Sequence, residues 1–180
     1  MVRRTMVFLM VVALAGVLVS VLPAQQQAVN FKKLQEFLPK IDLAGFTKGK
    51  PGGQTSTVLG MSTSEATLMY EKSGGDNPTS IEVKISDMAG VPFGQLGVSM
   101  MGATEFETET DTGYEKSVKI QGFPGTERVD SSEDGKSAQI TLVVGGRFMV
   151  ELNAQGTSDA ALLRKLIDSM KLGELAKVTQ

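Results

Sequence analysis

The feature that most constrains the fold of this 180-residue chain is the alternation of apolar and polar residues along much of its length. In residues 80–87, Ile81, Val83 and Ile85 occupy every second position, and charged or hydroxyl-bearing residues lie between them. A period of two places the apolar side chains on one face of a β-strand and the polar side chains on the other. The sequence therefore predicts a sheet with one face in the core and the other in water.

Short turn sequences separate the expected strands, which is typical of an antiparallel sheet. The expected strands cover residues 61–71, 80–87, 104–112, 114–121, 123–130, 137–144 and 147–154, so we expect about six to seven of them. Gly145-Gly146 joins the last two, because this pair suits the positive φ angles of a tight two-residue hairpin turn. The stretch from Lys48 to Gly53 has turn residues and little apolar content, so we expect a mobile loop there.

Two segments have the pattern of a capped helix. The first covers residues 31–38, with Asn30 as its N-cap and Pro39 at its end. The second begins at Ser158 or Asp159 and runs to about residue 171, with an apolar stripe formed by Leu162, Leu163, Leu166, Ile167 and Met170. This stripe is expected to cover a sheet face formed by Ile140, Leu142, Val144, Phe148, Val150 and Leu152.

A third segment, residues 90–103, has mixed signals. Its apolar residues have helical spacing, namely Phe93, Leu96, Met100 and Met101. Three glycines in the same segment each weaken a helix by up to about 1 kcal/mol relative to alanine, so we expect a marginal helix. The predicted fold class is thus α+β, an antiparallel β-sheet flanked by a short N-terminal helix, a marginal middle helix and a C-terminal helix.

The N-terminal residues have the pattern of an export signal. Arg3 and Arg4 precede an apolar run from Met6 to Leu22, and Pro23-Ala24 follows it. We therefore expect residues 1–24 to be a signal peptide and residues 25–180 to be a single exported domain, with its core in about residues 55–172, in the periplasm or outside the cell. The alternative is that the run is retained as an N-terminal anchor, since it is near the lower length limit for crossing a bilayer.

The chain contains no histidine and no cysteine. This composition excludes Ser-His-Asp and Cys-His catalytic machinery, nearly all zinc sites and the lipid-modified cysteine of bacterial lipoproteins. The basic residues are scattered without a basic stripe, which argues against nucleic-acid binding and against adsorption to anionic lipid. We predict no cofactor and no membrane contact other than through a retained signal segment.

Two acidic motifs suggest cation binding. Asp130 to Gly135 matches the opening of an EF-hand loop, but its twelfth position is Thr141 in place of the bidentate glutamate, so we expect a solvated hairpin turn. The other motif is an alternation of four carboxylates, Glu105, Glu107, Glu109 and Asp111. We expect this alternation to be a wet strand face or a protected edge, with a weak divalent-cation or basic-partner site as the alternative. Its other face, with Phe106, Thr108 and Thr110, should be half-buried.

Three further hypotheses concern metal binding and catalysis. Dispersed methionines are expected to fill the core and not to hold copper, namely Met61, Met69, Met88, Met100, Met101, Met149 and Met170. Glu127 forms a possible carboxylate pair with Asp130 or Glu133, and Lys136 a possible dyad with a serine. No spacing rule selects any of these, so we predict no catalytic residue and no metal ligand.

The order of elements resembles that of a known group of domains. The resemblance rests on the segments DTGYEKSVKIQGFPGTERVD and GGRFMVELNAQGTSDAALLRKLIDSMKLGELA. Their layout is similar to uncharacterised bacterial exported domains of the PsbP/Mog1/LpqN-like group. The resemblance implies an antiparallel sheet flanked by helices and a role in binding or assisting other proteins, and it supplies no site residue.

These observations together favour a non-enzymatic binding or assembly module of unknown specificity. The alternative is a carrier of a small apolar ligand, bound between the sheet and residues 90–103. In that case Phe93, Leu96, Met100 and Met101 are the expected ligand or partner contacts, because apolar and thioether side chains adapt to an apolar surface. The partner is therefore expected to be a protein or a small apolar ligand.

Overall fold

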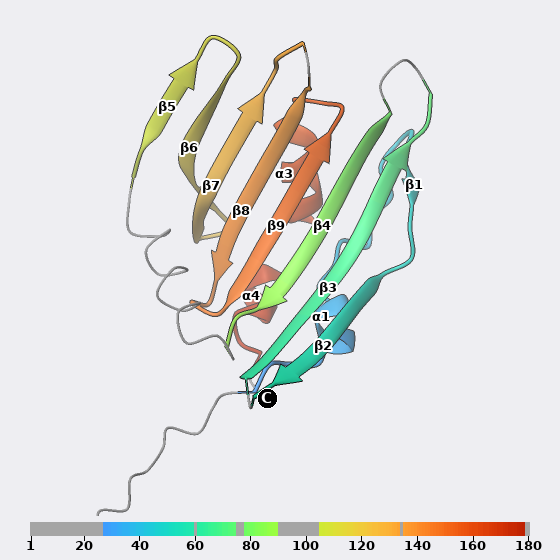
Figure 1. Ribbon diagram of the computed structural model, residues 1–180, viewed down its shortest axis with the longest axis vertical. Coiled ribbons are helices and arrows are strands. Elements are labelled where there is room, and N and C mark those ends of the chain that lie inside the picture. Colours follow the sequence, from blue (N-terminus) through green and yellow to red (C-terminus); the bar gives the residue numbers. More distant parts are fainter. Residues whose placement is uncertain (1–26, 60, 75–77, 90–104, 134, 179–180) are drawn as a thin grey trace, which may run out of the picture.

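The computed structural model describes residues 27–59, 61–74, 78–89, 105–133 and 135–178. They form a nine-stranded antiparallel sheet and three short helices (Figure 1). The α+β class and the antiparallel sheet are thus confirmed, with more strands than the six to seven expected. The segment 90–103 lies outside the described residues, as do Phe93, Leu96, Met100 and Met101.

The strands run in the order β1-β3-β4-β9-β8-β7-β6-β5 across the sheet, and β2 also pairs with β3. Their bounds are β1 Thr47–Lys48, β2 Gly52–Val58, β3 Met61–Lys72, β4 Thr79–Asp87, β5 Glu107–Thr110, β6 Gly113–Ile120, β7 Phe123–Asp130, β8 Ser137–Val144 and β9 Phe148–Gln155. The strands β5 to β9 form a meander, and the β3–β4 hairpin joins it through the pairing of β4 with β9. The predicted bounds of β7 and β8 are those of the structure.

The helices α1 (Phe31–Gln35), α3 (Ala160–Asp168) and α4 (Leu172–Leu175) all lie on one face of the sheet (Figure 1). Both predicted caps are present, because the Asn30 side chain accepts a hydrogen bond from the Lys32 amide and that of Asp159 from the Ala161 amide. The C-terminal helix is shorter than predicted, since a turn after Asp168 leads into α4. No helix in the described ranges is long and apolar enough to cross a membrane.

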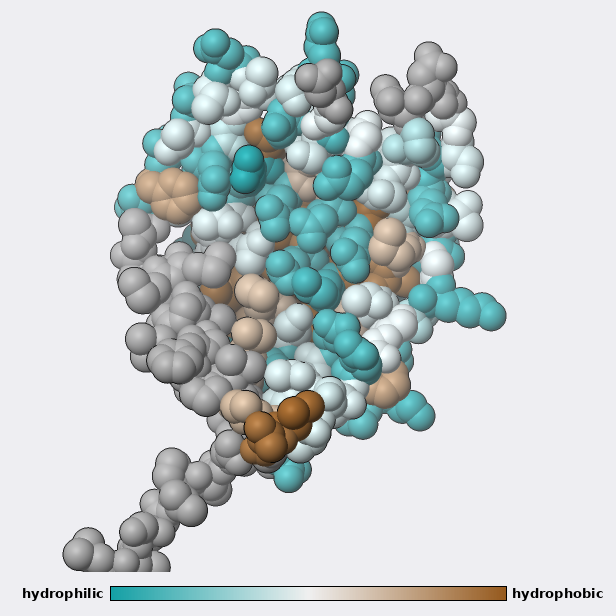
Figure 2. Space-filling view, viewed as in Figure 1, coloured by the Kyte–Doolittle hydropathy of each residue, from teal (hydrophilic) through white to brown (hydrophobic). Residues whose placement is uncertain are grey.

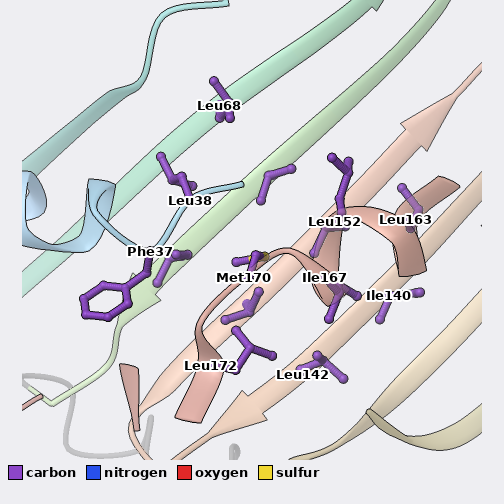
Figure 3. Close-up of a cluster of buried hydrophobic side chains, with 14 of the residues drawn as sticks. Phe37, Leu38, Leu68, Ile140, Leu142, Leu152, Leu163, Ile167, Met170 and Leu172 are labelled. Carbon is purple, nitrogen blue, oxygen red and sulfur yellow. The ribbon is translucent and has the colours of Figure 1, made fainter. Parts of the chain in front are cut away.

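The core lies between the helices and the sheet, as the C-terminal stripe predicts (Figure 3). In α3, Leu163, Leu166 and Ile167 are fully buried, whereas Leu162 packs at the margin. They face the six predicted residues of β8 and β9, all of them buried: Ile140, Leu142, Val144, Phe148, Val150 and Leu152.

The loop expected from Lys48 to Gly53 is shorter in the structure and covers residues 49–51, because β1 ends at Lys48 and β2 begins at Gly52. Gly53 approaches its neighbours so closely that a Cβ atom would lie 2.5 Å from the Glu65 carbonyl oxygen and 2.8 Å from the Phe31 ring. Residues 53–58 of β2 are exposed, so backbone pairing to β3 forms this edge strand without an apolar pattern.

The β8–β9 turn and the edge strand β5 also differ from expectation. The β8–β9 turn has three residues and not two, because Val144 pairs with Phe148, although Gly145 and Gly146 do have positive φ angles of 61° and 64°. The strand expected over residues 104–112 is only β5, which is exposed on both faces. Phe106 is 37% exposed, so the half-buried face that we expected there is wrong.

A buried ion pair fixes one end of the sheet. Arg147, the third residue of the β8–β9 turn, donates to both carboxylate oxygens of Asp87, from Nε at 2.8 Å and from Nη2 at 2.6 Å. The same carboxylate accepts hydrogen bonds from the amides of Val29 and Ala89, and Arg147 Nη2 also donates to the Gln27 carbonyl. The hydrogen bonds of Asp87 and Arg147 therefore join the start of the described chain, the end of β4 and the β8–β9 turn.

We expect Leu166→Ala to lower the free energy of unfolding by about 2–5 kcal/mol, because it leaves a cavity between α3 and the sheet. Equilibrium denaturant unfolding measures this loss. The matched control is Lys165→Ala on the exposed side of the same helix, which should change stability by less than about 0.5 kcal/mol. A loss below about 1 kcal/mol for Leu166→Ala would contradict the packing of α3.

We also expect Asp87→Asn to destabilise the domain by about 3–5 kcal/mol, because it leaves the Arg147 guanidinium buried without a counter-charge. The same unfolding measurement tests it, with Asp168→Asn at the exposed end of α3 as the control. If both substitutions cost the same small amount, the ion pair does not hold this end of the sheet.

Candidate functional site

The sheet face opposite the helices, which we call the open face, is the candidate site. Its central row, read across the strand pairings, is Thr67, Lys84, Glu151, Thr141, Thr126 and Ser117. Thr141 in this row is buried, as is Val143 two residues further along β8 on the same face. The adjacent row is Met69, Glu82, Asn153, Gln139, Arg128 and Glu115. Figure 2 shows this face as predominantly hydrophilic. Sequence alternation predicted a wet face but no particular site on it.

An ion pair lies at the centre of the open face. Lys84 Nζ is 2.7 Å from Glu151 Oε2, and the two side chains are 29% and 15% exposed. The hydrogen bond to Glu151 raises the pKa of Lys84 above its usual value and outweighs the opposing effect of burial. Lys84 is therefore a fixed cation, unsuited to act as the neutral amine that nucleophilic catalysis requires.

Amide side chains and a guanidinium group surround a shallow depression beside this pair. The depression has a volume of about 180 Å³ and is lined on this face by Arg128, Ser137, Gln139, Asn153 and Gln155. These groups offer hydrogen-bond donors and acceptors at the surface, and Arg128 is exposed. Such a surface suits a partner that carries polar groups, for example the backbone and side chains of another polypeptide.

A larger hollow of about 680 Å³ lies at one end of β5, β6 and β7. Its lining comprises Glu105, Phe106, Glu107, Lys116, Ser117, Val118, Lys119, Gly122, Pro124 and Gly125. Apolar side chains thus alternate with charges of both signs. This lining differs from the mainly apolar wall of a site for a small apolar ligand.

The acidic alternation lies on and beside the edge strand β5. In the register of β5 and β6, Glu107 lies opposite Lys116 and Glu109 lies opposite Tyr114, and all residues of β5 are exposed. In the part of the chain that the structure describes, no three acidic side chains come together in a way that could hold a metal ion. The arrangement fits a solvated, charged edge that resists pairing with other chains.

Glu127 is not part of a carboxylate pair. It is buried on the helix side of the sheet, where Arg164 Nη2 lies 2.6 Å from its Oε2 and the Tyr114 hydroxyl donates to its Oε1 at 2.9 Å. Burial, and then the hydrogen bond to Glu127, raise the pKa of Tyr114. Three residues further along the same strand, Asp130 projects from the opposite face. Glu127 therefore attaches α3 to the sheet.

The calcium-like loop forms the β7–β8 hairpin, in which Asp130 pairs with Ser137. The Asp130 carboxylate accepts a hydrogen bond of 2.8 Å from the Ser132 amide, which lowers the pKa of the carboxyl. The expected hairpin turn is thus confirmed.

The methionines differ from the prediction of core filling. Among those in the described ranges, only Met170 belongs to the core, while Met61 and Met69 are exposed and Met88 and Met149 are partly so. Met69 and Met149 lie on the open face, where their flexible side chains add apolar contact area to a polar surface.

Millimolar Ca²⁺ should raise the melting temperature by no more than about one or two degrees. The EF-hand-like loop lacks its terminal glutamate, and the described residues of both motifs form no acidic cluster that could hold a metal ion. Thermal unfolding with and without Ca²⁺ measures this, with Mg²⁺ at equal ionic strength as the control. A large, saturable rise that disappears in Glu107→Gln would show that the edge strand binds the ion.

Comparison of the chain with protein-family models, with curated proteins and with solved structures found no match. The resemblance to the PsbP/Mog1/LpqN-like group therefore stays a prediction, and the candidate site depends on geometry alone.

Proposed function

We propose that this protein is an exported, non-enzymatic binding or assembly module that receives a protein partner on its open face. The observation that carries this proposal is the asymmetry of the sheet: its described helices cover one face, and the other presents two rows of mainly polar side chains. The fixed Lys84–Glu151 pair and the exposed Arg128 supply oriented charges. Arginine is common at the energetic centres of protein interfaces.

Two observations support binding in preference to catalysis. The whole chain lacks histidine and cysteine, the commonest general base and a common nucleophile. Its central lysine is held in the charged form by Glu151.

The alternative function, a carrier of a small apolar ligand, has some support from the hollow beside β5. Phe106, Val118 and Pro124 contribute apolar surface there. Glu105, Glu107, Lys116 and Lys119 line the same hollow, and burying such charges against an apolar ligand is costly. We therefore favour the protein partner.

The place of action that we propose is the periplasm or the extracellular space, reached through residues 1–24. The charged start, the apolar run and the small residue at position 24 support this. Scattered basic residues support a partner other than nucleic acid.

Site-specific photocrosslinking in the exporting host tests the proposed face. A photoreactive amino acid at Gln139, on the open face, should give a discrete protein adduct, whereas the same group at Lys165 on α3 should not. Arg128→Ala should reduce the adduct about tenfold or more without lowering the melting temperature, because it removes an exposed donor of the interface.

Equal adducts from both positions would contradict the open face as the binding surface. Native mass spectrometry of the same preparation distinguishes the alternative, because a carrier would retain a small apolar molecule and give no protein adduct.

A further inference from the structure

The β2–β3 hairpin ends in three exposed apolar side chains, which we call the hairpin tip. Val58 is 60% exposed, Leu59 91% and Met61 37%. Figure 2 shows a compact hydrophobic patch at the end of the molecule where β2 terminates in Figure 1. The open face above it is polar, so the tip is chemically distinct from the proposed binding surface.

The backbone conformation at Leu59 indicates that a leucine at this position does not serve the stability of the turn. Val58 pairs with Met61, which leaves a two-residue turn, and Leu59 has a φ of +51°. Such turns favour asparagine, aspartate or glycine at this position, because leucine is strained in the left-handed region. The other non-glycine residue with positive φ in the described ranges, Gln121, has a structural role, since its side chain donates to the Ile167 carbonyl at 2.7 Å. In Leu59 a strained backbone instead presents a large apolar side chain to solvent.

The chain enters the domain at the same end of the sheet as the tip. Asp87, which accepts the Val29 amide, pairs with Ser64 of β3, and Met61 lies three residues further on, a distance of about 10 Å. Arg147 holds the Gln27 carbonyl at this end as well. The apolar run ends at Leu22, only five residues before Gln27, which span at most about 18 Å when extended.

We propose that, in the chain that retains residues 1–24, the hairpin tip inserts into the lipid bilayer that holds the N-terminal apolar run. The domain then touches the membrane at two points, the anchor and the tip, whereas the sequence alone predicts contact through a retained signal segment only. This inference does not depend on the function proposed for the open face.

Lipid suits the tip better than a protein partner does. Three side chains on a protruding turn are far too small for a stable protein interface, which buries about 800 Å² on each partner. The next pair of residues is polar and uncharged, with the Thr57 hydroxyl donating to Ser62 at 3.3 Å, as suits the headgroup region. Residues 52–58 and 61–71 contain no lysine or arginine, so the tip needs no anionic lipid.

The absence of tryptophan from the chain provides a direct test. Val58→Trp in the full chain, reconstituted into phosphatidylcholine vesicles, should show emission shifted to shorter wavelength and quenched by brominated acyl chains. Lys72→Trp, at the opposite end of β3 and also exposed, is the matched control and should show neither effect. Raising the salt concentration should leave the quenching unchanged.

A second substitution separates insertion from folding. Leu59→Asn, made in the Val58→Trp chain, should keep or raise the melting temperature, because asparagine accepts a positive φ, and should abolish most of the quenching. The proposal is overturned if the tryptophan introduced at the tip is not quenched while the chain is folded and membrane-bound, or if Leu59→Asn leaves quenching intact. An emission shift that needs no vesicles and grows with protein concentration would also overturn it, and would instead assign the tip to a second copy of the chain.

Discussion

The buried pair of Asp87 and Arg147 is the interaction on which the arrangement of this protein most depends. Both side chains are nearly inaccessible to water, so each charge is stabilised by the other and by the backbone groups around them. The Arg147 guanidinium also lies over the Phe148 ring, 5.1 Å from its centroid. Because the carboxylate also accepts the Val29 amide and the guanidinium donates to Gln27, the pair joins segments that are far apart in sequence. It thereby sets where the chain enters the domain.

The second organising feature is that the described helices cover only one face of the sheet. Residues of α3 complete the core against β8 and β9, and the Arg164–Glu127 pair fixes the helix over β7. The opposite face then consists mainly of the polar positions of the same strands, because side chains alternate along each strand. One sequence pattern therefore generates both the stable core and the proposed binding surface.

The two proposed contacts lie in different parts of the molecule and depend on different physics. The open face extends along the strands and offers charges and amides, which favour a specific polar partner. The tip, at one end of β3, offers only apolar area and no charge, which favours a nonspecific apolar phase. Because the tip lies at the end of a strand, its insertion into a bilayer would leave the length of the open face accessible to a partner.

The sequence by itself determined the elements whose side chains alternate or repeat on a helical face. Strands β7 and β8, the β3–β4 hairpin, the caps at Asn30 and Asp159 and the packing of α3 were all predictable, because burial imposes a period on local sequence. The candidate site was predictable only as a wet face. Tertiary structure alone decided strand β2, which is held by backbone pairing and has no apolar pattern, and the third turn residue, Arg147, which turns inward to a carboxylate 60 positions away. Edge pairing and distant ion pairs leave no periodic trace in a sequence, because they depend on which segments the fold brings together.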